Sequence, residues 1–117
     1  MPFKLNHVAL TVEDRERSAL FYSRWFGLTN RLHEDDHLLI LSNDTGALLA
    51  LSAGEKPRPL PRTTHFGFQV DNAEMVHDIR HKFRAAGIEE AEWQEAGPTR
   101  VQVFDPDGYR VEVYGWS

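Results

Sequence analysis

The stretch THFGFQV at residues 64–70 decides the fold, because it repeats the pattern of NHVALTV at residues 6–12. In both stretches a histidine comes second, and large apolar residues then alternate with small or polar ones. A period of two is typical of a β-strand, whose successive side chains point to opposite faces. After each stretch the apolar residues follow helical spacing up to a glycine, which predicts helices at about residues 15–26 and 72–86.

Three further strands are expected after each helix, so that the order is βαβββ, linker, βαβββ. The linker is GEKPRPLPRT at 54–63, whose three prolines exclude a helix or a central strand. Repeated order and repeated turns indicate duplication, and we interpret residues 1–117 as one α+β domain with modules at about 1–53 and 64–117. The expected strands lie near 28–33, 37–42, 47–53, 88–94, 99–104 and 110–115, with the turns NDTG (43–46) and DPDG (105–108) before the last strand of each module.

Composition excludes several classes of protein. The chain has 117 residues, 41% of them hydrophobic, which suits one compact domain. It has no cysteine, so disulfides, thiolate metal sites and cysteine nucleophiles are ruled out. No apolar run approaches the roughly 18–20 residues of a membrane span, and the N-terminus lacks a signal-peptide pattern. We therefore expect a cytoplasmic protein without a membrane partner, and the net charge of −5 argues against nucleic acid.

Strand alternation predicts a shared face for three side chains that bind metals. In their strands His7, His65 and Glu112 point away from the apolar, helix-covered face. Two imidazoles and one carboxylate form a facial triad that leaves coordination positions open, and they suit one divalent ion of Fe, Mn, Ni, Co or Zn. The competing interpretation is that the histidines are hydrogen-bonded core residues and that Arg100 or Arg110 pairs with Glu112.

Duplication also predicts how many ligands the protein supplies. Aligning Gly46 with Gly108 puts Ala50 at the position that matches Glu112. Alanine cannot bind a metal ion, so we expect three protein ligands, with the other positions left for solvent and substrate.

Further polar and aromatic side chains are expected near these ligands. Glu112 and Tyr114 are the catalytic candidates, although Tyr114 also fits a structural role. Five more residues are expected to line the same concave face: Ser52, Gln69, Arg100, Gln102 and Phe104. They either bind a polar or anionic substrate or only line a hydrated groove.

Three other motifs favour structural roles. HEDDH at 33–37 fits the zincin pattern, but it lies between two expected strands, whereas that chemistry needs a helix. His77 and His81 lie on the solvent-facing side of the second helix. DPDG resembles part of a calcium loop, yet its proline and glycine fit a hairpin turn.

With these motifs in place, the chain resembles the vicinal oxygen chelate superfamily. The resemblance rests on LNHVALTVEDRERSALFYSRWFGL, THFGFQV and DPDGYRVEVYG, and it covers nearly the whole chain. This superfamily includes glyoxalase I, extradiol dioxygenases, fosfomycin-modifying thiol transferases, methylmalonyl-CoA epimerase and bleomycin-resistance proteins. The resemblance implies the glyoxalase/bleomycin resistance/dihydroxybiphenyl dioxygenase fold, with a half-open curled sheet, a homodimer, and a metal ion at His7, His65 and Glu112. That ion would bind a substrate through two neighbouring oxygens.

Differences between this chain and the members of the superfamily restrict the reactions that the resemblance implies. Glyoxalase I and the epimerase are similar to this chain but place a glutamate at the position of Ala50, and the fosfomycin transferases place a threonine at that of Ala9. Extradiol dioxygenases need further histidine and tyrosine residues, which this sequence does not identify. We therefore expect a metal-dependent dioxygenase, lyase or thiol transferase that acts on a small molecule. The alternative is a drug-sequestering protein of the bleomycin-resistance type, which needs no metal.

Overall fold

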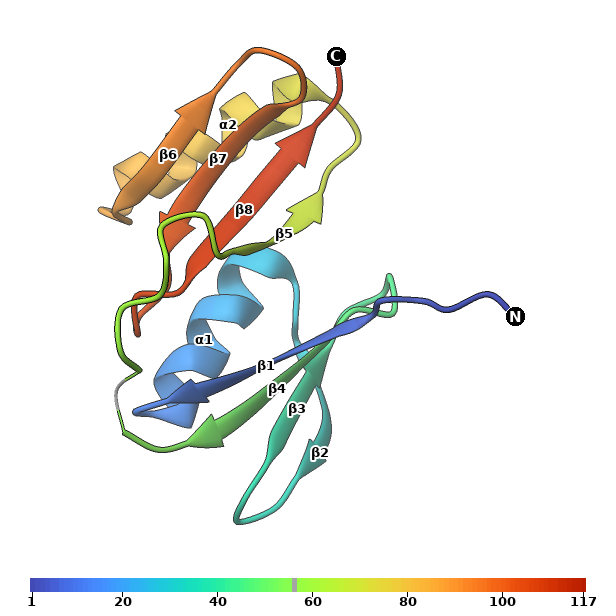
Figure 1. Cartoon of the computed structure of the whole chain (residues 1–117), viewed down its shortest axis with the longest axis vertical. Helices are drawn as coiled ribbons and strands as arrows, with labels where there is room; N and C mark the ends of the chain where they lie inside the picture. Colours follow the sequence, from blue (N-terminus) through green and yellow to red (C-terminus); the bar gives the residue numbers. More distant parts are fainter. Residues whose placement is uncertain (56) are drawn as a thin grey trace. The chain divides into compact units, whose positions relative to one another are not determined.

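The computed structural model describes residues 1–55 and 57–117, and it divides the chain into two compact units, Met1–Arg58 and Pro59–Ser117. We call them the first and the second module. Each consists of one helix and one four-stranded sheet (Figure 1). Lys56, which belongs to the expected linker, lies outside the described residues.

The first module has the order βαβββ. In its sheet the strands follow the order β1-β4-β3-β2, and β1 runs parallel to β4 while the other neighbours are antiparallel. Its elements are β1 (His7–Val12), α1 (Arg15–Phe26), β2 (Asn30–Glu34), β3 (Leu39–Ser42) and β4 (Leu48–Ala53).

The second module repeats this topology with the strand order β5-β8-β7-β6, in which β5 is parallel to β8. The predicted α+β class and the two βαβββ modules are therefore confirmed. The last two strands have the expected bounds, whereas β5 and β6 are shorter than expected, and β5 begins at Phe66, so that His65 directly precedes the strand. The elements are β5 (Phe66–Gln69), α2 (Ala73–Ala85), β6 (Glu90–Gln94), β7 (Thr99–Phe104) and β8 (Arg110–Gly115).

Both helices begin at a side chain that caps the first turn. The Asp14 carboxylate accepts a hydrogen bond from the backbone N–H of Arg17 at 3.1 Å, and Asn72 accepts one from Met75 at 3.0 Å. α1 ends at Gly27, whose φ of 68° lies in the left-handed region that favours glycine. In the described part of the chain, no helix has the length and apolarity needed to cross a membrane.

The hydrophobic core of each module lies between its helix and one face of its sheet. In the second module Val111 and Val113 of β8 are buried, and α2 contacts β7 and β8 and contributes Val76 and Phe83. Since strand side chains alternate, Glu112 points to the other, open face. The first module follows the same rule, with Leu10 and Val12 buried and Ala9 and Thr11 exposed.

Each module carries a β-bulge in its edge strand at the equivalent place. In β2 the pairing with β3 shifts between Arg31 and His33, and in β6 the pairing with β7 shifts between Glu90 and Glu92. The extra residue reverses which face the following side chains occupy. Glu90 therefore pairs with Arg80 of α2, whereas Glu92 reaches the open face.

Candidate metal centre

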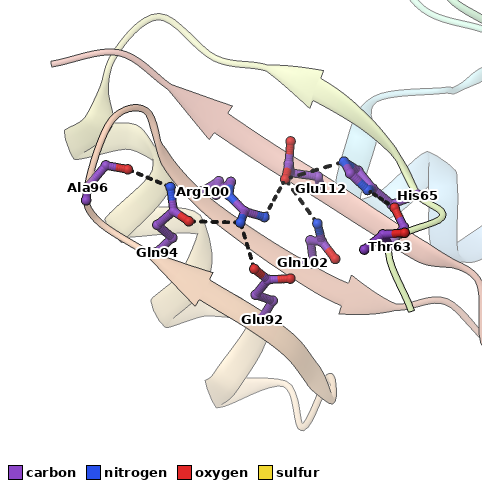
Figure 2. A network of polar contacts seen from close by, with 8 residues as sticks. All are labelled: Thr63, His65, Glu92, Gln94, Ala96, Arg100, Gln102 and Glu112. Carbon is purple, nitrogen blue, oxygen red and sulfur yellow. Dashed lines mark hydrogen bonds and ion pairs between the residues drawn. The ribbon is translucent and has the colours of Figure 1, made fainter. Parts of the chain in front are cut away.

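Glu112 is the hub of a polar network on the open face of the second module (Figure 2). Its side chain is only 12% exposed. The carboxylate atom Oε1 accepts hydrogen bonds from Nη1 of Arg100 and from Nε2 of Gln102, both at 3.2 Å. Nε2 of His65 lies 3.7 Å from the same oxygen. One imidazole and one carboxylate of the expected triad therefore meet within a single module.

The strand register explains how these side chains converge. Glu112 on β8 lies directly opposite Gln102 on one side and Gly67 on the other. A Cβ atom at Gly67 would lie 2.9 Å from Cβ of Glu112 and 3.0 Å from its backbone oxygen. The missing side chain at residue 67 thus leaves room for Glu112. The side-chain amide of Gln102 reaches across from β7 to the carboxylate of Glu112.

The orientation of His65 leaves one ring nitrogen available to a metal ion. Its Nδ1 lies 2.9 Å from the backbone oxygen of Thr63. A carbonyl oxygen only accepts hydrogen bonds, so Nδ1 carries the proton and the neutral ring keeps a lone pair on Nε2. That lone pair faces Glu112. Two bonds of about 2.1 Å to a shared ion span up to about 4.2 Å, so the separation of 3.7 Å fits two ligands of one ion.

Arg100 is the arginine partner of Glu112 that the sequence offers as an alternative to a metal ion. Its Nη2 donates to Oε1 of Glu92 at 2.7 Å and to Oε1 of Gln94 at 2.9 Å, while Nη1 donates to Glu112. Burial lowers the pKa of Arg100, but the hydrogen bonds and charges of Glu92 and Glu112 outweigh burial and leave that pKa above its ordinary value. The other candidate, Arg110, lies over the ring of Phe104, 5.2 Å from its centroid.

His7 belongs to the first module and is the first residue of β1. Its side chain is exposed, and its Nδ1 lies 3.2 Å from Oδ1 of Asn6. Among residues 1–55 and 57–117, no three histidine or acidic side chains gather closely enough to hold an ion together. The three-ligand site remains a prediction, for which the second module supplies an adjacent pair.

The remaining predicted site residues occupy the faces that alternation indicates. The hydroxyl of Tyr114 donates to Oε1 of Gln69 at 3.3 Å on the same sheet. Gln102 is only 2% exposed, and within the described part of the chain its Oε1 has no hydrogen-bond partner. Ser52 lies half-buried on β4, opposite Thr11. Their roles in substrate binding and catalysis stay predictions.

Sequence reasoning missed Glu92 and Gln94, which complete the network around Arg100. Simple alternation along β6 puts Glu90, Glu92 and Gln94 on one face. The bulge after Glu90 separates them, and no residue type in EAEWQ indicates a bulge. Only the pairing of β6 with β7 identifies which two of the three face Arg100.

The structural interpretations of the other motifs agree with the observed contacts. In HEDDH, Oδ1 of Asp35 accepts from the backbone N–H groups of His37 and Leu38, so the motif covers the end of β2 and the turn that follows, and it forms no helix. In DPDG, Oδ1 of Asp105 accepts from the backbone of Asp107 and Tyr109, as expected of a hairpin turn.

The sequence of the chain matches a known family. The family model described as "Glyoxalase/Bleomycin resistance protein/Dioxygenase superfamily" matches residues 4–113. The chain belongs to this superfamily. Its membership confirms the resemblance drawn from the repeated strands and the DPDGYRVEVYG ending.

Curated members of the superfamily that are similar to the chain are named as enzymes. A trivalent organoarsenical cleaving enzyme of Bacillus sp. (strain MD1) is 30% identical over 120 residues, which cover 95% of this chain and 72% of that protein. The probable enzyme of the same name from Bacillus subtilis is 27% identical over 95% of this chain and 79% of its own length. The glutathione transferase FosA of Serratia marcescens is 23% identical over 94% of this chain and 79% of that protein.

Solved structures from the superfamily share the fold over almost the whole chain. A possible glyoxalase from Bacillus cereus has a TM-score of 0.82 and 26% identity, covering 97% of this chain and 99% of that one. A lactoylglutathione lyase from Agrobacterium tumefaciens has a TM-score of 0.77 and 25% identity, covering 97% and 94%. The names of these proteins refer to different reactions, so membership of the superfamily alone does not identify the reaction.

Proposed function

We propose that the chain is a metal-dependent enzyme in which His7, His65 and Glu112 hold one divalent ion. The separation of 3.7 Å between Nε2 of His65 and Oε1 of Glu112 carries the proposal, because two ligands of one ion lie about this far apart. The donor set of two nitrogens and one oxygen suits Fe, Mn, Ni, Co or Zn. When bound, such an ion stabilises negative charge that develops on a substrate oxygen.

The substrate proposed for this site is a small molecule with two neighbouring oxygens. The side chains around Glu112 offer oxygen and nitrogen atoms alone. Gln102 donates to Glu112 and Tyr114 donates to Gln69, and we propose that the remaining polar atoms of these side chains bind polar groups of the substrate. A trivalent arsenic centre is a soft acceptor that favours thiolates, and the chain contains no cysteine. We therefore do not extend the activity of the organoarsenical relatives to this chain. A dioxygenase-like or glyoxalase-like reaction, the latter a lyase or transferase, is proposed instead.

Metal analysis of protein purified without chelator tests the proposal. We expect close to one ion per chain in the wild type and a large loss of metal in His65→Ala, because Nε2 is a ligand. His77→Ala is the matched control, since His77 also lies 3.8 Å from a glutamate, Glu95, but belongs to a different face of the module. Equal metal content in His65→Ala and His77→Ala would contradict the proposal.

Drug sequestration without a metal is the second candidate function. The observation that favours it is the ion pair between Arg100 and Glu112, because this pair already compensates the carboxylate without a metal ion. A wild-type protein that takes up none of the five ions at equilibrium, yet binds planar drugs tightly, would favour sequestration over catalysis.

The remaining expectations are also proposals. We infer a homodimer from the resemblance to the superfamily, and the molar mass in solution tests it. A cytoplasmic location and the absence of a nucleic-acid partner stay predictions from composition.

A further inference from the structure

Glu112 accepts two hydrogen bonds on the carboxylate oxygen that also lies near His65. Arg100 and Gln102 donate to Oε1 at 3.2 Å, and Nε2 of His65 lies 3.7 Å from the same atom. Figure 2 shows the guanidinium of Arg100 between the carboxylates of Glu112 and Glu92. The two arms of the guanidinium are used separately, since Nη1 binds Glu112 and Nη2 binds Glu92 and Gln94. Arg100 is thereby tied to the edge strand β6 while it holds the carboxylate on β8.

We propose that Arg100 is a positioning residue, which orients Glu112 toward His65, and that Glu92 anchors Arg100 and balances its charge. The inference rests on the proposed function, because it concerns the affinity for the ion. Arginine suits this task because its planar group with five donors bridges two carboxylates in a fixed geometry, which the single ammonium of lysine cannot do.

Charge arithmetic assigns a separate task to Glu92. Arg100 and Glu112 alone sum to zero, so a cation near them would gain little from their charges. Glu92 adds a second carboxylate 2.7 Å from Nη2 of Arg100, and the three groups together carry one negative charge. The positive charge of Arg100 can therefore hold Glu112 in place while the network as a whole still attracts a divalent ion.

The decisive variant is Arg100→Gln, because charge and positioning predict opposite results. Removing a positive charge beside the site favours a bound cation, so charge alone predicts tighter binding of Mn²⁺. Lost positioning predicts weaker binding, and residues that orient a ligand typically contribute about 10–100-fold to metal affinity. We expect the Kd for Mn²⁺, measured by titration with electron paramagnetic resonance of the free ion, to rise at least about tenfold.

Arg80→Gln is the matched control for that variant. Arg80 and Arg100 are equally exposed, at 22%, and each binds a glutamate of β6 at 2.7 Å. Arg80 differs because it belongs to α2, which covers the other face of the sheet. We expect Arg80→Gln to lower the thermal unfolding temperature of the metal-free protein about as much as Arg100→Gln does, while its Kd for Mn²⁺ stays within about twofold. Arg100→Lys should recover only part of the affinity, because lysine keeps the charge and loses the bridge.

Glu92→Gln and Glu90→Gln form a second pair that keeps side-chain size and removes one charge from the same strand. Weaker Mn²⁺ binding in Glu92→Gln alone supports the inference. If the wild type binds Mn²⁺ and Arg100→Gln binds it as tightly as Arg80→Gln does, or more tightly, the positioning role is wrong and the proposed function stands. If the wild type binds neither Mn²⁺ nor any of the other four ions, both fall together.

Discussion

Gly67 illustrates how one missing side chain makes a site. Its φ is not in the left-handed region, so its backbone conformation does not require glycine. What requires glycine is the close approach of Glu112, whose Cβ and backbone oxygen would lie 2.9 and 3.0 Å from an added Cβ. A backbone oxygen in a strand pair cannot turn aside as a flexible side chain can, so the contact is relieved only by moving β5 away from β8.

Gly67→Ala should therefore destabilise the protein and disturb Glu112. We expect a loss of about 1–3 kcal/mol in the free energy of unfolding, as for other overpacked positions, measured by urea unfolding. Gly54→Ala is the control, because its added Cβ would meet the side-chain methyl of Thr11 at 2.8 Å, which a rotation can relieve. An equal or larger loss in Gly54→Ala would contradict this account.

The residues of the candidate site differ in how far the sequence predicts them. His65 and Glu112 follow from the alternating pattern, since each lies next to the apolar residues of one face and is therefore expected on the opposite face. Glu92 could not be found in this way, because the bulge that aims it depends on pairing between β6 and β7. The sequence also could not decide whether Arg100 or Arg110 pairs with Glu112. The answer depends on the strand register, which places Arg100 opposite Tyr114 and two residues before Gln102.

At the level of elements, the turn between β2 and β3 contains a carboxylate that accepts several hydrogen bonds. Asp35 accepts hydrogen bonds from His33 at 2.8 Å and from the backbone N–H groups of His37 and Leu38 at 2.7 and 2.8 Å. The bond to His33 lowers the pKa of Asp35 most, followed by the two backbone bonds, and the pKa falls from 3.8 to about 2. All of these bonds favour the charged form of the carboxyl group.

The turn should therefore weaken in acid over a defined range. A carboxyl group whose pKa is lowered by folding contributes stability above its unfolded value of 3.8, and this contribution is lost as the pH falls toward the folded value of about 2. We expect the ¹³C carboxyl resonance of Asp35 to titrate near pH 2. In His33→Ala its midpoint should move up toward 3.8. A wild-type midpoint at the ordinary value would show that the side chain does not hold the turn.

The boundaries of the elements show which local signals are reliable. α1 spans Arg15–Phe26 as predicted, because Asp14 caps its start and Gly27 ends it. The first strand of each module is shorter than its alternating pattern, since pairing with β4 begins at His7 and pairing with β8 begins at Phe66. Helix ends are encoded in neighbouring residues, whereas strand ends depend on a partner strand distant in the sequence.

For the whole molecule, the two modules share the same strand register. Val8 faces Leu49 and Ala9 faces Ala50 in the first module, as Phe66 faces Val111 and Gly67 faces Glu112 in the second. The bulges in β2 and β6 also fall at matching places. Repeated patterns in one sequence thus predicted the topology of both modules, and the observed register supports the alignment of Ala50 with Glu112 on which the three-ligand proposal depends.

This equivalence leads to a prediction about ligand number. If the alignment of Ala50 with Glu112 extends to metal binding, a glutamate at residue 50 becomes a fourth protein ligand. Ala50 differs from Glu112 in facing Ala9, whose methyl group occupies the space that Gly67 leaves open. The appropriate variant is therefore Ala9→Gly with Ala50→Glu, which reproduces the pair of the second module. We expect it to bind Mn²⁺ at least about tenfold more tightly, or ~1.4 kcal/mol, as measured by calorimetry.

Added charge alone must be separated from added coordination. Ala53→Glu places the same charge at the exposed end of β4, so it reports the long-range attraction of a carboxylate for the cation. We expect this variant to change the Kd for Mn²⁺ by less than about twofold. Equal effects in Ala53→Glu and in the double variant would mean that residue 50 does not reach the ion, and that the internal symmetry of the fold does not extend to its metal centre.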